Sequence, residues 1–201
     1  MGVVELIGLA GSVSLLSGWR IYLCTFVVGL AMRSGWIALP EHLDGLAVLA
    51  NPWILGISFI GLIAEFLADK VMWLDSAWDA VHTLIRPVGG ALLALALIDA
   101  QDPAWQAASV LLGGSAALLT HSAKTGTRAV VNASPEPVSN VVISSGEDIA
   151  TGGLLVLAIA NPVAAVAIAV VITIAAAWAV LALRRILRRL TAPVPAAPDR
   201  G

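Results

Sequence analysis

Long apolar stretches dominate the chain, and most end at a proline, a glycine or a charged residue. A bilayer core of about 30 Å needs about 20 mostly apolar residues in a helix. Six stretches come near that length and predict helices at roughly residues 3–32, 51–69, 81–98, 104–122, 138–160 and 162–184. The last stretch is the clearest, because no charged residue lies between Pro162 and Leu183.

Two of these stretches carry a weaker signal. The run from Pro87 to Ile98 holds only 12 apolar residues, and the stretch at 138–160 contains Glu147 and Asp148. Five membrane spans with a re-entrant segment are therefore an alternative to six spans.

The composition narrows the class of protein. Of 201 residues, 59% are hydrophobic and 12% are charged, whereas a water-soluble domain carries roughly 25% charged residues. A net charge of −2 without a basic, aromatic stripe argues against nucleic acid as a partner, and the single Cys24 cannot form an internal disulfide. We therefore expect an all-α integral membrane protein, with one polytopic helical domain at 1–190 and a disordered Pro- and Ala-rich tail at 191–201.

Basic residues give the expected orientation. In a six-span arrangement only Arg33 lies on the side opposite the arginines that follow the last span, which predicts a cytoplasmic C-terminus. Tryptophans near the expected helix ends agree with these boundaries, since an indole ring prefers the headgroup region. They are Trp36, Trp53, Trp73 and Trp105.

Ionisable residues inside apolar stretches are the candidates for function, because each costs at least about 2.5–3.5 kcal/mol in hydrocarbon. Arg20 lies deep in the first stretch, and either a structural ion pair or binding of an anion explains it. Glu147 and Asp148 lie in a polar, glycine-rich segment at 144–153. We expect the helix to break there around a site, with a surface loop as the alternative.

Residues 71–86 combine an apolar face with a polar face and predict an amphipathic helix on the membrane surface. Its polar face carries Asp75, Asp79, His82 and Arg86. A solvated face explains these residues better than a cation site, and we predict no metal centre. Glu65, at the end of the second stretch, reaches the interface or a basic partner.

The fourth stretch ends with Lys124 and Arg128, which suit either a phosphate group or positive-inside anchoring. A connector rich in proline follows, and we expect Asn132, Glu136 and Asn140 to line the entrance of a pathway.

Gly11–Ser17 in the first stretch resembles Gly114–Thr120 in the fourth, as an inverted three-plus-three repeat would produce. Small residues also allow close helix approach, within one chain or in a homo-oligomer. They include Gly89, Gly90, Gly113, Gly114, Gly152 and Gly153.

Several patches together resemble a known family. They are Ser17–Arg20, Trp73–Asp79, His121–Arg128, Val131–Asn140 and Ser145–Asp148. Over nearly the whole chain these patches are similar to the bacterial family called domain of unknown function 4126, although its members often have Phe at the position of Val138. The resemblance implies a multi-pass protein of the bacterial inner membrane and implies no activity.

The leading hypothesis is a small helical channel or transporter for an ion or small polar solute. The alternative is a membrane scaffold or a protein that interacts with lipid. An enzyme acting on lipid through Asp75, Asp79 and His82 is a third hypothesis. The sequence lacks GxSxG, Walker and HExxH patterns, which argues against a hydrolase, nucleotidase or metalloprotease and makes an enzyme the less favoured hypothesis, and we expect no cofactor.

Overall fold

The computed structural model describes residues 3–37, 47–98, 102–132 and 137–190. Within these ranges the chain forms helices and no strands. The helices are α1 (Val3–Arg33), α2 (Pro52–Ala68), α3 (Met72–Leu97), α4 (Pro103–Asn132), α5 (Pro137–Ala160) and α6 (Pro162–Leu190). The predicted all-helical bundle is confirmed, whereas the predicted disordered tail lies outside the described residues.

Proline fixes the first turn of four helices, α2, α4, α5 and α6. Proline suits this position because its missing N–H would have no partner inside the helix. Two of these prolines follow an asparagine that caps the helix. Asn51 Oδ1 accepts from Trp53 N at 2.9 Å, and Asn161 Oδ1 accepts from Ala164 N at 3.1 Å.

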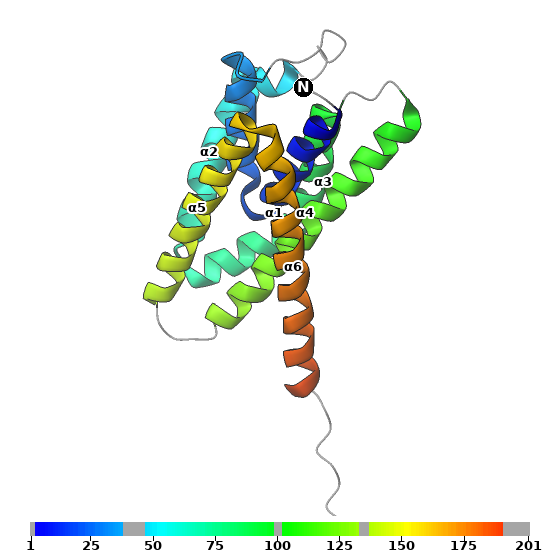
Figure 1. Ribbon diagram of the computed structural model, residues 1–201. Helices are drawn as coiled ribbons and strands as arrows, with labels where there is room; N and C mark the ends of the chain where they lie inside the picture. The colour runs from blue at the N-terminus through cyan, green and yellow to red at the C-terminus, as the bar shows by residue number, and fades with distance from the viewer. Residues whose placement is uncertain (1–2, 38–46, 99–101, 133–136, 191–201) are drawn as a thin grey trace, which may run out of the picture.

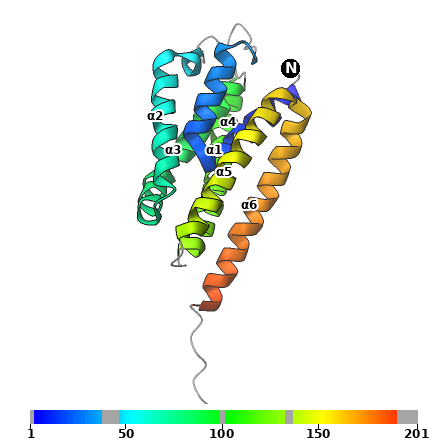
Figure 2. The ribbon, with the colours of Figure 1, turned by 90° about the vertical axis from the view of Figure 1, so that its left-hand side faces the viewer.

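Helices α2 to α6 run between the two ends of the bundle in alternating directions (Figures 1 and 2). We call the end where α1 starts the N-terminal end of the bundle, and the end where α6 finishes its C-terminal end. The basic Arg184 and Arg185 lie on the last turns of α6, at the C-terminal end.

Helix α1 folds back on itself at Arg20, whose backbone is not helical (φ −142°, ψ 78°). Before Arg20, the chain follows α4 away from the start of α4, with Ser14 beside Gly113 and Gly18 beside Thr120. After Arg20, it returns along α2 towards the start of α2.

Two contacts mark this return. Tyr22 lies beside Gly61, and Gly29 lies beside Leu55. Both ends of α1 consequently lie at the N-terminal end of the bundle, as Figures 1 and 2 show. We call Arg20 the vertex of α1.

The folded-back α1 supplies much of the apolar core. Its Leu9, Val13, Leu16, Cys24 and Val28 are fully buried, and they belong to one cluster with residues of α3, α5 and α6. The other helices therefore surround α1, and the vertex ends in the interior of the bundle.

Small residues allow α1, α3 and α4 to approach closely. A Cβ on Gly90 would lie 2.9 Å from the Gly113 carbonyl oxygen, so only glycine permits this crossing of α3 and α4. Thr120 Oγ1 donates to the Leu15 carbonyl at 2.7 Å and ties α4 to α1.

The predicted inverted repeat gains no support from this packing. Its two similar segments, Gly11–Ser17 and Gly114–Thr120, lie in helices that run in the same direction where they touch. An inverted repeat would have placed them in opposite directions.

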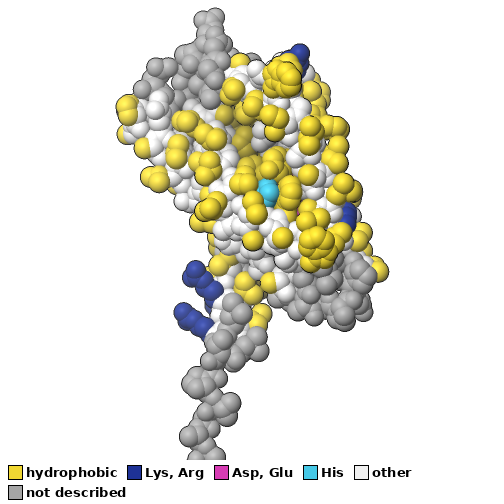
Figure 3. All heavy atoms as spheres, turned by 180° about the vertical axis from the view of Figure 1, so that it is seen from behind, with side chains coloured by type: hydrophobic (Ala, Val, Ile, Leu, Met, Phe, Trp, Pro, Cys, Tyr) yellow, Lys and Arg dark blue, Asp and Glu magenta, His cyan; other side chains and the backbone are white. Residues whose placement is uncertain are grey.

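The outer surface is apolar over most of its height. Exposed large hydrophobic side chains cover α2, α3 and α6, and Figure 3 shows mainly hydrophobic side chains across one face. Among the described residues, four helices are long and apolar enough to cross a membrane by length and composition, namely α1, α3, α5 and α6, and α2 is a shorter apolar helix. An apolar exterior around a charged interior indicates a membrane protein.

The predicted tryptophans are all exposed near helix ends: Trp36, Trp53, Trp73 and Trp105. The segment predicted as a surface helix, 71–86, is the first part of a longer helix. Residues 72–97 form one helix, α3, whose polar side faces the bundle interior, and α4 likewise continues past the expected end at 122 to Asn132.

Candidate functional site

Charged side chains from five helices meet inside the C-terminal half of the bundle. We call them the ionic network, and every member makes at least one ion pair. The members are the cations Arg20, Lys70, Arg86, Lys124 and Arg128 and the carboxylates Glu65, Asp69, Asp75, Asp79, Glu147 and Asp148. Lys70, Glu147 and Asp148 are partly exposed, and the other eight residues are buried.

The vertex of α1 brings Arg20 into this network. Its guanidinium pairs with Asp69 at the end of α2, and its Nε lies 2.8 Å from Asp148 Oδ1 in α5. Its Nη2 donates to the Ser144 carbonyl at 3.2 Å. A helical backbone at Arg20 would continue α1 past these groups, so the fold-back and the ion pairs depend on each other.

Asp69 joins three helices. Besides Arg20, its Oδ2 lies 3.2 Å from Lys124 Nζ and 3.7 Å from Arg128 Nη2. One carboxylate thus faces three cations, an arrangement that offsets part of the cost of burying them.

Arg86 of α3 forms a second centre, nearer the middle of the bundle. Its Nη2 lies 2.8 Å from Glu65 Oε1, and its Nη1 lies 3.1 Å from Asp79 Oδ1. The same Nη1 faces His121 Nδ1 at 2.7 Å and the Gly18 carbonyl oxygen at 3.2 Å. Arg86 therefore connects α2, α3 and α4 to the residues just before the vertex.

The outer part of the network reaches water more readily. Arg128 Nη2 lies 2.9 Å from Glu147 Oε2, and Lys70 Nζ lies 3.3 Å from Asp148 Oδ2. The side chains of Glu147 and Asp148 are 19% and 21% exposed. The network thus runs from this partly exposed edge to the buried pair of Glu65 and Arg86.

Two pockets adjoin the network on either side of α4. The first pocket, of about 300 Å³, lies between α3 and α4 and is lined by Asp75, Asp79, Thr83 and Arg128, among others. The second, of about 220 Å³, includes Lys124 and Glu147 and is walled by alanines of α6. Polar groups of the network are therefore accessible from two directions.

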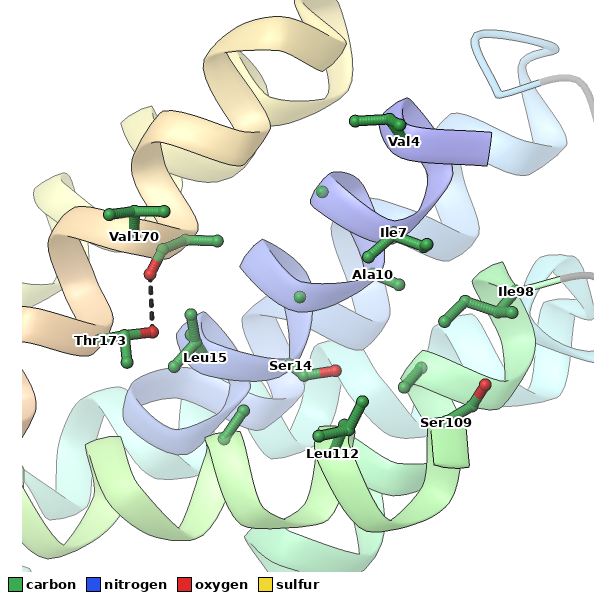
Figure 4. Close-up of a pocket in the computed structure, with 16 residues that line it drawn as sticks. Val4, Ile7, Ala10, Ser14, Leu15, Ile98, Ser109, Leu112, Val170 and Thr173 are labelled. Atoms are coloured by element: carbon green, nitrogen blue, oxygen red, sulfur yellow. Dashed lines mark hydrogen bonds between the residues drawn. The ribbon is translucent and has the colours of Figure 1, made fainter. Parts of the chain in front are cut away.

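A third pocket, of about 350 Å³, lies towards the N-terminal end between α1, α4 and α6. Figure 4 shows its mainly apolar lining, with Val4 and Ile7 of α1, Leu112 of α4 and Val170 of α6 around it. This pocket contains no charged side chain, so it differs in chemistry from the pockets beside the network.

One protein family matches most of the chain. The family described as "Domain of unknown function (DUF4126)" matches residues 7–182. The chain belongs to this family. No curated protein and no solved structure matches the chain. The resemblance expected from the sequence is confirmed, and the match covers every helix that contributes to the ionic network.

Most of the candidate residues come together in the network of this family member. Those placed there are Arg20, Glu65, Asp75, Asp79, Arg86, Lys124, Arg128, Glu147 and Asp148. Asn132 is the last residue of α4, and Asn140 lies in α5. The structure describes the backbone of these two residues but not their side chains, and Glu136 lies outside the described residues. The expected entrance at the connector therefore stays a prediction.

Two expectations differ from the structure. Asp75, Asp79, His82 and Arg86 are buried rather than solvated. Their ion pairs and hydrogen bonds inside the bundle explain why. Among the described residues no group of three or more His, Cys, Asp or Glu could hold a metal ion.

The second difference concerns the broken helix. Helix α5 is continuous through the glycine-rich segment, and the backbone break lies at Arg20 of α1 instead. Nothing lies within 4 Å of the Cβ position of Gly146, Gly152 or Gly153, so these glycines are ordinary helical residues on an open face.

Four participants were missing from the sequence-based candidates: Asp69, Lys70, His121 and Thr83. Asp69 follows Glu65 by four residues, which places both carboxylates on one face of α2, and this spacing was the available signal. Thr83 and His121 meet through Thr83 Oγ1 and His121 Nε2 at 3.1 Å, a contact between α3 and α4 that no spacing within one helix reveals.

Proposed function

We propose that this protein is a small membrane channel or transporter for an ion or small polar solute, and that the ionic network forms its pathway at membrane depth. One observation carries the proposal: α1 breaks at Arg20 inside the bundle and returns to the side from which it came. Non-helical backbone at membrane depth is tolerated where it is buried in protein or lines a polar cavity, and transporters use such broken helices to bind ions.

The positions of the polar pockets support access to the network from the C-terminal end of the bundle. Both polar pockets adjoin the network in the C-terminal half, whereas apolar residues of α1 fill the centre of the N-terminal half. In this arrangement a solute reaches the network from the C-terminal end, and passage to the other end requires the halves of α1 to move.

The distribution of basic residues supports an orientation. Arg184 and Arg185 lie at the C-terminal end, and Arg33 lies at the N-terminal end of the bundle. By the positive-inside rule the C-terminal end faces the cytoplasm of a bacterial inner membrane. In this proposed orientation the fold-back of α1 is a re-entrant helix pair, α2 to α6 are five spans, and the N-terminus is on the opposite side.

Flux into liposomes that contain the purified protein tests this function. Common cations and anions are scanned with and without a pH gradient, in the wild type and in Arg20→Gln, Glu147→Gln and Asp148→Asn. We expect a selective flux that is lost in these variants and retained in Arg184→Gln, which removes an exposed charge outside the network. Equal flux in all proteins, or no flux from folded wild type, contradicts the proposal.

A second candidate is a membrane scaffold that transports nothing. The observation in its favour is the density of ion pairs, which cross-link five helices as a structural network would. Under this hypothesis the same substitutions lower the thermal stability in detergent, and no flux exists for them to change.

A further inference from the structure

His121 lies in the interior of the bundle with a partner at each ring nitrogen. The residue is 1% exposed. Its Nδ1 lies 2.7 Å from Arg86 Nη1, and its Nε2 lies 3.1 Å from Thr83 Oγ1. An arginine guanidinium can only donate hydrogen bonds, so Nδ1 must be the acceptor in this contact. The ring is therefore neutral, with its proton on Nε2.

The hydrogen bonds of Thr83 are consistent with this tautomer and orient the ring. Its Oγ1 donates to the Asp79 carbonyl oxygen at 3.0 Å, which leaves a lone pair to accept the Nε2 proton of His121. The hydroxyl thus holds the ring with Nδ1 towards Arg86. Thr83 and Asp79 also line the pocket between α3 and α4. Only the Thr83 side chain therefore lies between this pocket and the His121 ring.

The lone pair of His121 Nδ1 can hold Arg86 or a proton, but not both. A protonated ring has a donor at both nitrogens, and it would set its positive charge against the guanidinium. Arg86 has other acceptors close by, because Glu65 Oε1 lies at 2.8 Å and Asp79 Oδ1 at 3.1 Å. Protonation therefore favours release of Arg86 from His121, while these carboxylates keep the guanidinium paired.

Such a movement reaches the vertex of α1. The Arg86 nitrogen that faces His121 also donates to the Gly18 carbonyl at 3.2 Å, two residues before Arg20. When Arg86 withdraws from His121, this contact to α1 is lost as well. A proton on one histidine is thereby linked to the helix pair whose movement the proposed pathway requires.

Charged groups from several helices surround this histidine. Arg86 and Asp79 face it from α3 and Lys124 from α4, while Glu65 of α2 lies across Arg86. Arg20 of α1 and Glu147 of α5 lie further out in the network, and α6 carries no ionisable side chain before Arg184. Two carboxylates are thus close enough to receive Arg86 when the ring becomes charged.

We propose that His121 Nδ1 is a proton-binding site at which a proton and the Arg86 guanidinium compete, and that proton binding releases Arg86 from α1. The role of this site in coupling rests on the proposed function, in which the proton is then the coupling ion. Thr83 is a positioning residue, because it orients the ring without touching Nδ1.

Nitrogen NMR of the purified protein in lipid nanodiscs tests the site directly, with ¹⁵N-labelled histidine and arginine and a pH titration. We expect His121 to begin as the Nε2–H tautomer and to become doubly protonated in one step, with the Arg86 side-chain signals shifting at the same pH. Thr83→Val should keep the Nε2–H tautomer, because Arg86 still donates to Nδ1, but it removes the hydroxyl that orients the ring and should shift the pH of the linked step.

His82 provides the matched control within the same spectra. It is also buried, but its nitrogens contact the Trp78 carbonyl oxygen at 2.7 Å and the Tyr22 hydroxyl at 3.1 Å rather than an arginine. His82→Gln and His42→Gln together assign the signals of the three histidines, and His82→Gln should leave the linked shift of His121 and Arg86 in place.

Two results would overturn the proposal. One is a neutral His121 at every pH at which the protein stays folded, and the other is protonation of His121 without a change at Arg86. Neither depends on flux. Linked titration without flux would therefore reject the transport function alone, and flux without linked titration would reject the proton site alone.

Discussion

The two halves of the bundle are held together by different physical means. Towards the N-terminal end, α1 buries apolar side chains such as Leu9 and Val28, and small residues bring α3 and α4 into contact at Gly90 and Gly113. Towards the C-terminal end, the same helices are joined by ion pairs around Asp69 and Arg86. The first half depends on shape, and the second depends on charge balance.

This difference supports the proposed position of the pathway. Apolar packing suffices to join helices in a membrane, whereas each buried charge carries a desolvation cost. A protein that needed only a stable bundle could have used small apolar residues throughout, as its N-terminal half does. The costly half is also the half with polar pockets and the broken helix.

The largest expected effect comes from removing the carboxylate that faces three cations. Asp69→Asn keeps the shape of the side chain but leaves Arg20 and Lys124 short of a counter-charge. We expect the free energy of unfolding to fall by about 3–5 kcal/mol, as for a broken buried ion pair. Thermal and denaturant unfolding in detergent measure this change.

The control for this experiment is Arg184→Gln, which removes an exposed charge and should change the stability by about 0.5 kcal/mol or less. If Asp69→Asn were as mild as this control, water would have to fill the centre of the network, and the contrast between the two halves would fail.

A smaller effect is expected in the apolar half from one added methyl group. In Gly113→Ala the new Cβ would lie 2.6 Å from the Gly90 carbonyl oxygen, so α3 and α4 must move apart. We expect a loss of about 1–3 kcal/mol in the same unfolding assay, the usual cost of overpacking.

Gly152→Ala is the matched control for the glycine experiment, because nothing lies within 4 Å of that Cβ position in α5. Alanine favours a helix over glycine, so this variant should be up to about 1 kcal/mol more stable than the wild type. Equal destabilisation by both variants would show that close contact at Gly113 is not the cause.

The smallest stability effect is expected at the exposed edge of the network. Glu147 pairs with Arg128 at 2.9 Å, but its side chain is 19% exposed. We expect Glu147→Gln to cost about 1 kcal/mol or less, since partly solvated ion pairs contribute little. A near-normal unfolding curve together with lost flux would separate the pathway role of Glu147 from the structural role of Asp69.

The sequence predicted several helices closely because apolar runs are a local signal, and the expected limits of α2 and α5 lie within one residue of those observed. The expected limits fail where polar residues face the interior: α3 begins at Met72 rather than 81, and α4 ends at Asn132 rather than 122. The charged candidates were also found, since an ionisable residue within an apolar stretch needs a partner. Their partners could not be derived, because Arg20 and Asp69 meet only through the packing of α1, α2 and α5.

The fold-back of α1 was the main feature that the sequence concealed. The stretch from Val3 to Arg33 has the length and apolar character of a single span, and glycines at 146–153 drew the expected break to α5 instead. At the vertex, Arg20 forms ion pairs with Asp69 and Asp148, which lie far from it in the sequence. Local sequence patterns do not reveal such contacts.

The side of the membrane on which each part of α1 lies is the most direct test of this account. Single cysteines are introduced as Val4→Cys, Ser34→Cys and Arg184→Cys in a Cys24→Ala background, and a membrane-impermeant maleimide is applied to intact cells and to inverted vesicles. The account predicts that Val4→Cys and Ser34→Cys react from the same side and Arg184→Cys from the other. Reaction of Val4→Cys and Ser34→Cys from opposite sides would show that α1 spans the membrane and would contradict the re-entrant vertex.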